Sequence, residues 1–107
     1  MPAVLLLSIA IASEVAGTVA LKYTDGFTRI GPSALVVAGY GISFWMLALV
    51  LKELPIGLTY AVWAAVGTAL IAAIGIVAFG EPANTLKLLS LALIIAGVVG
   101  LNLEGAH

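Results

Sequence analysis

The chain has 107 residues, of which 64% are hydrophobic and 8% are charged, and its mean hydropathy is +1.28. A soluble domain of this length could not bury so much apolar surface, so we expect an integral membrane protein. The chain has no cysteine, one histidine and a net charge of −1. This composition excludes disulfides and thiolate or histidine metal clusters, and it argues against nucleic-acid binding.

Turn residues and charges divide the chain into four apolar segments. Asp25-Gly26 marks a turn after the first segment, and the short connector at 52–55 forces an antiparallel pair. We expect the first segment to be a retained helix, because no Lys or Arg precedes it as in a cleaved leader. The predicted helices span about residues 2–21, 33–51, 56–79 and 85–103.

These four segments predict an all-α integral membrane fold, a single transmembrane domain over residues 1–107 with short loops. Each segment has about the 20 residues that a membrane-spanning helix needs, and continuous apolar runs are not the alternating pattern of barrel strands. Four helices alone enclose little space for a ligand and its access path. We therefore expect a cavity at a subunit interface, and hence a homodimer or larger assembly.

Glu14 lies in the middle of the first apolar segment, ten residues from Val4. That distance is about 15 Å along a helix, the midplane of a hydrocarbon core about 30 Å thick. A charge there costs about 2.5 kcal/mol or more, so such residues usually serve a function. The other four acids and all the basic residues lie at or beyond the segment ends. The counter-charge of Glu14 must therefore be a proton or a cation from outside the chain.

Small residues share the helix face of Glu14. Ala10, Gly17 and Thr18 lie three or four positions away, which places them on the same side of a helix. Small residues allow helices to pack closely in membranes. Beside a carboxylate they also leave room for a ligand, and the sequence does not separate these two explanations.

Three aromatic residues lie at depths similar to that of Glu14. Tyr40 is well inside the second segment, and Tyr60 and Trp63 share one face of the third. Aromatic rings attract desolvated cations, so a functional role is favoured over an interfacial one. Trp45 is interpreted as an ordinary interfacial residue.

Further small residues predict places where helices bend or pack. Gly67 lies in a small-residue patch of the third segment, where the helix could bend or slide. Ser90 and Gly97 lie seven positions apart in the fourth segment and predict a packing face, between subunits in our interpretation.

The chain resembles the small multidrug resistance transporters over essentially its whole length. Four stretches carry the resemblance: SEVAGTVALKYTDGFTR at 13–29, GYGISFWMLA at 39–48, LPIGLTYAVWAAVGTA at 54–69 and GVVGLNL at 97–103.

The resemblance implies an antiparallel, dual-topology homodimer in a bacterial inner (cytoplasmic) membrane. Two copies of Glu14 would form one site that opens alternately to each side and exchanges lipophilic or quaternary ammonium cations for protons. The protein would be a multi-pass antiporter and not an enzyme, with no cofactor beyond the coupling proton. The resemblance implies that proton and substrate are contacted by Glu14, Tyr40, Tyr60 and Trp63. It implies a pocket lined by Ala10, Gly17, Thr18, Ser43 and Ala64. The implied contact between subunits is at Gly97.

Two subtypes of that family remain open. Ala10, Gly17 and Tyr40 match the multidrug pattern. Ala64 and Ala65 stand where relatives often have serine and glycine, and the connector at 80–84 is closer to that of guanidinium exporters. The multidrug subtype is favoured, with guanidinium export as the alternative.

Two other classes use some of these features. A proteolipid rotor subunit also carries a buried carboxylate, but it is normally a two-helix hairpin with the acid in its second helix. A non-transporting assembly subunit would explain the packing glycines but not Glu14 with Tyr60 and Trp63. Both are less favoured.

Overall fold

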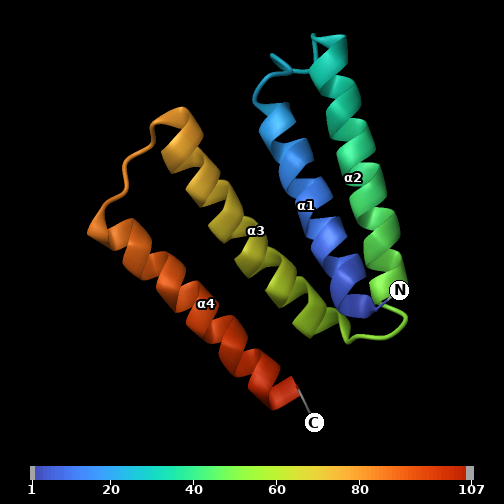
Figure 1. Ribbon diagram of the computed structural model, residues 1–107, viewed down its shortest axis with the longest axis vertical. Helices are drawn as coiled ribbons and strands as arrows, with labels where there is room; N and C mark the ends of the chain where they lie inside the picture. The colour runs from blue at the N-terminus through green and yellow to red at the C-terminus, as the bar shows by residue number, and fades with distance from the viewer. Residues whose placement is uncertain (1, 106–107) are drawn as a thin grey trace. The chain divides into compact units, whose positions relative to one another are not determined.

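The computed structural model describes residues 2–105, and within that range it contains four α-helices and no strand (Figure 1). All four are long and apolar enough to cross a membrane, which confirms the predicted fold class. The shortest, with 19 residues, is about 28 Å long, close to the thickness of the hydrocarbon core. The helices are α1 (Ala3–Leu21), α2 (Ile30–Val50), α3 (Ile56–Phe79) and α4 (Thr85–Gly105).

The start of α2 differs from the sequence prediction. The helix begins at Ile30 and not at residue 33, because Pro32 falls within its first turn. Proline is tolerated there, since the first amide groups of a helix have no partner within the helix in any case. The other predicted ends agree within one or two residues, the usual scatter of helix boundaries.

The chain forms two compact units, each a pair of consecutive helices. The first unit holds α1 and α2 and ends at Leu54, and the second begins at Pro55 and holds α3 and α4. Continuous apolar surface on all sides of each helix is expected for helices that face lipid as well as protein.

Thr24 organises the turn between α1 and α2. Its side chain is buried, donates a hydrogen bond to the carbonyl of Leu21 at 2.9 Å and accepts one from the Phe27 amide at 3.2 Å. The turn passes through three residues with left-handed backbone at Asp25, Gly26 and Phe27. The predicted Asp25-Gly26 turn is therefore present.

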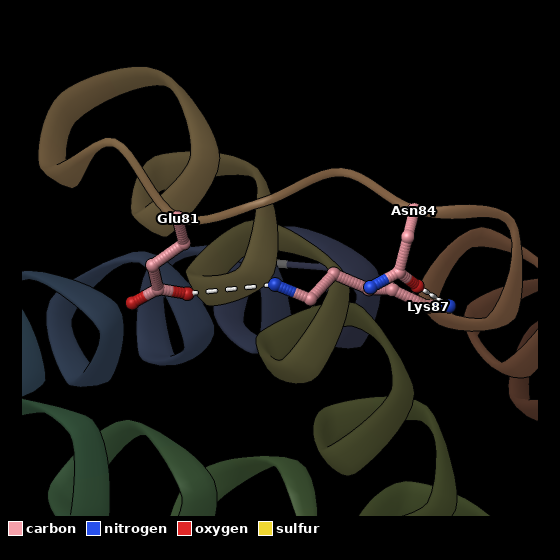
Figure 2. Close-up of polar contacts among 3 residues, drawn as sticks. All are labelled: Glu81, Asn84 and Lys87. Carbon is pink, nitrogen blue, oxygen red and sulfur yellow. Dashed lines mark hydrogen bonds and ion pairs between the residues drawn. The ribbon is translucent and has the colours of Figure 1, made fainter.

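The α3–α4 loop is built from a glycine end and an asparagine cap. Gly80 has left-handed backbone (φ 68°), which ends α3 and lets the amide of Glu81 donate to the carbonyl of Gly75 at 3.1 Å. Asn84 accepts a hydrogen bond from the amide of Lys87 at 2.8 Å and so caps α4 (Figure 2).

An ion pair crosses the same loop. The Nζ of Lys87 lies 3.7 Å from Oε1 of Glu81, whose side chain is 51% exposed (Figure 2). Exposed pairs of this kind contribute about 1 kcal/mol or less. Gly80 and the cap by Asn84 therefore determine the conformation of the loop more than the ion pair does.

Helix α4 presents an open surface. None of its side chains between residues 85 and 103 is buried, and no atom would lie within 4 Å of a Cβ added at Gly97 or Gly100. Ser90 is exposed as well. The small-residue face predicted for this helix is therefore uncovered in the isolated chain.

Candidate functional site

Glu14 is half-buried in α1 and forms a hydrogen bond within its own helix. The hydroxyl of Thr18 donates to Oε1 of Glu14 at 2.9 Å. The two residues are four positions apart, so their side chains lie one above the other on the helix. Thr18 therefore holds the carboxylate along the side of α1.

Tyr40 connects this pair to α2. Its hydroxyl lies 2.7 Å from Oγ1 of Thr18. A threonine hydroxyl has one proton and two acceptor lone pairs, and here the proton points to Glu14. Tyr40 must therefore donate to Thr18, which gives a directed chain of two hydroxyl groups that ends at the carboxylate of Glu14.

The ring of Tyr40 is positioned by Gly17. A Cβ added at Gly17 would lie 3.3 Å from Cδ1 of Tyr40, so the glycine leaves the space that the ring occupies. On α2, Phe44 stacks near Tyr40 with ring centroids 6.4 Å apart. Gly17, one of the small residues predicted beside Glu14, thus serves contact between helices in this structure.

Gly39 allows a close approach of α1 and α2. A Cβ added there would lie 2.8 Å from the backbone oxygen of Ser13 and 3.1 Å from Cα of Gly17. This residue was not predicted from the sequence. Its spacing of four from Ser43 is a small-residue signal of helix packing that could have found it.

Two other predicted pocket residues, Ala10 and Ser43, are fully buried. Within residues 2–105 the hydroxyl of Ser43 has no hydrogen-bond partner. A buried unpaired hydroxyl costs about 1–3 kcal/mol, so it favours a water or ligand that can accept or donate. Ser43 lies three positions after Tyr40, on the same face of α2.

The remaining predicted residues belong to α3 in the second unit. Tyr60 is 68% exposed, Trp63 is half-buried and Ala64 is exposed. Gly67 is buried, and α3 continues through it without interruption. The contact of Tyr60 and Trp63 with Glu14 stays a prediction, as does bending at Gly67.

The family model described as Small Multidrug Resistance protein matches residues 3–94, which include α1, α2, α3 and half of α4. The chain belongs to the Small Multidrug Resistance family. Together with the four helices, membership establishes a multi-pass membrane protein.

Individual relatives agree with this membership. The quaternary ammonium compound-resistance protein QacE of Escherichia coli is 48% identical over 99 residues, which cover 92% of this chain and 90% of the relative. The multidrug resistance protein EbrA of Bacillus atrophaeus is 49% identical over 96 residues, 90% of this chain and 91% of the relative. A guanidinium exporter of Proteus vulgaris is 46% identical over 90 residues, 84% and 86% respectively. These relatives are named as resistance proteins and an exporter, and not as enzymes.

Proposed function

We propose that this chain is a proton-coupled antiporter that exports lipophilic and quaternary ammonium cations, with Glu14 as the shared site for proton and substrate. The observation that carries the proposal is the carboxylate of Glu14 at the middle of an apolar helix, with the hydroxyl groups of Thr18 and Tyr40 directed toward it. The ionised form of Glu14 is the one that attracts a cation.

Proton and substrate compete because they neutralise the same oxygen atoms. An ionised Glu14 attracts a lipophilic cation, and a protonated Glu14 does not. The ring of Tyr40 lies beside Thr18, and Tyr60 and Trp63 supply further aromatic faces for a desolvated cation. Proton binding on one side of the membrane then releases the cation, and proton loss on the other side readies the site again.

The functional unit in this proposal is an antiparallel homodimer in a bacterial inner membrane. The uncovered small-residue face of α4, with Ser90 and Gly97, supports contact between subunits. Two copies of Glu14 would then share one cavity. Small adjustments of α3 near Gly67 would open that cavity to each side in turn.

The relatives support a cationic substrate without deciding its size. One similar protein is named for resistance to quaternary ammonium compounds, and another is named a guanidinium exporter. We propose the larger lipophilic cations, because Ala10, Gly17 and Tyr40 follow the multidrug pattern. Guanidinium is the second candidate, favoured by the sequence of the α3–α4 loop and by the similarity to a protein named a guanidinium exporter.

The test is transport by the purified chain in proteoliposomes with an imposed pH gradient. We expect uptake of tetraphenylphosphonium into proteoliposomes that are acidic inside, at a rate well above that of guanidinium. Uptake of guanidinium alone would establish the second candidate. Uptake of neither cation, in protein that still binds tetraphenylphosphonium in detergent, would contradict the antiport proposal.

Thr18→Val tests the hydroxyl chain. Valine has nearly the same shape but cannot donate to Glu14 or accept from Tyr40, so the carboxylate loses one hydrogen bond and its connection to α2. A hydrogen bond to a charged group contributes about 1.5–3 kcal/mol, so we expect roughly a tenfold or greater loss of tetraphenylphosphonium affinity at neutral pH. Isothermal titration calorimetry measures this affinity. Thr18→Ser keeps the hydroxyl and should retain most of the affinity, and equal binding by both variants would contradict a role for the hydroxyl.

A further inference from the structure

Helix α1 begins and α2 ends at the same end of their hairpin (Figure 1). A groove lies at this end. Its volume is about 530 Å³, within the range of about 300–1,000 Å³ typical of small-molecule sites. The walls are apolar and the end toward the loop carries two charges. The lining residues are Leu6, Trp45, Met46, Leu49, Lys52 and Glu53.

The two charges at the loop end are opposite and do not pair with each other. Lys52 and Glu53 are both exposed, and neither side chain has a hydrogen bond or ion pair with any residue between 2 and 105. The ammonium of Lys52 and the carboxylate of Glu53, on neighbouring residues, are thus both available to a ligand. They lie just beyond Val50, the last residue of α2.

The groove crosses the boundary between hydrocarbon and headgroups. Trp45 lies five residues before the end of α2, which is about 7–8 Å along the helix, and its side chain is 63% exposed. Tryptophan side chains gather at this depth in membrane proteins. In a bilayer, the part of the groove lined by Leu6, Met46 and Leu49 would therefore face acyl chains, and the charged pair would face headgroups.

We propose that this groove binds one zwitterionic aminophospholipid. Lys52 contacts the phosphate, Glu53 contacts the terminal ammonium, and the first part of an acyl chain lies against Leu6, Met46 and Leu49. The order of charges in the headgroup matches the pair in the loop, and the exposed ring of Trp45 offers a face to the ammonium or the glycerol. An anionic phospholipid without an amine would satisfy Lys52 but would leave Glu53 beside a negative charge.

The experiment is native mass spectrometry of the full chain, purified in detergent and mixed with phosphatidylethanolamine or phosphatidylglycerol of the same acyl chains. We expect the wild-type chain to retain phosphatidylethanolamine about fivefold better, a modest preference because exposed ion pairs contribute little. Glu53→Gln should abolish that preference by losing phosphatidylethanolamine. Lys52→Gln should weaken the retention of both lipids.

Matched control variants lie in the opposite loop. Lys22→Gln and Asp25→Asn make the same charge changes outside the groove and should retain lipid as the wild type does. Equal retention of the two lipids by the wild type would overturn the proposal. So would unchanged lipid retention in Glu53→Gln and Lys52→Gln with a weakened dimer, because a second copy of the chain would then cover the groove. Binding of tetraphenylphosphonium reports separately on Glu14, so the outcome does not depend on the transport proposal.

Discussion

Glu14→Gln is expected to lower the affinity for tetraphenylphosphonium by at least roughly a hundredfold at neutral pH and to abolish cation transport against a proton gradient. Glutamine keeps the size of the side chain and its hydrogen bond with Thr18, and it removes only the charge and the titrating proton. Two unit charges about 4 Å apart attract by about 1 kcal/mol in water and by about 4 kcal/mol near a protein surface. Each 1.4 kcal/mol or so corresponds to a tenfold change in affinity.

The matched control for this change is Glu81→Gln. Glu81 is the half-exposed partner of Lys87 in the α3–α4 loop, so its neutralisation removes the same charge far along the chain from α1. We expect binding and transport close to the wild type. Transport by Glu14→Gln that still follows the pH gradient would contradict the proposed role of Glu14 as the proton site.

Gly39→Ala is expected to be the most damaging small substitution in the first unit. The new Cβ would lie 2.8 Å from the backbone oxygen of Ser13 and 3.1 Å from Cα of Gly17, and neither backbone atom can move aside alone. The helices α1 and α2 must separate, which costs about 1–3 kcal/mol by the usual scale of overpacking. Separation also lengthens the hydrogen bond between Tyr40 and Thr18.

Thermal unfolding in detergent and tetraphenylphosphonium titration measure the two effects. We expect a lower Tm and a cation affinity reduced about tenfold or more. Gly41→Ala is the matched control, since it lies two positions along α2 with no atom within 4 Å of an added Cβ. Gly41→Ala should leave the Tm and the cation affinity near the wild-type values. Equal Tm and equal affinity of Gly39→Ala and Gly41→Ala would contradict the close contact between α1 and α2.

The helices could be predicted from the sequence because each membrane-spanning helix corresponds to a continuous apolar run. A backbone in lipid must satisfy its hydrogen bonds internally, so each run of about 20 residues forms one helix. The start of α2 could not be predicted as well. A proline at the end of a polar stretch predicts that the helix starts after it. In the first turn of a helix, however, proline is tolerated because its missing N–H would have no partner there, so α2 includes Pro32.

The contacts of the candidate site were predictable only within one helix. Depth identifies Glu14, and a spacing of four identifies Thr18 as its neighbour. The meeting of Tyr40 with Thr18 depends on how α1 and α2 are aligned, and periodicity within a helix does not contain that alignment. The spacing of four between Gly39 and Ser43 indicates helix packing, but it does not show that Gly39 meets the backbone of Ser13 and Gly17 on the other helix.

Proton release on substrate binding is the measurement that tests the shared site most directly. Tetraphenylphosphonium is added to the purified chain in weakly buffered detergent solution, and the pH of the solution is recorded. We predict acidification as the cation displaces protons from Glu14, an effect that disappears at high pH where the carboxylate is already ionised and is absent in Glu14→Gln. Saturating binding of the cation by the wild-type chain with no proton release at any pH would contradict the account.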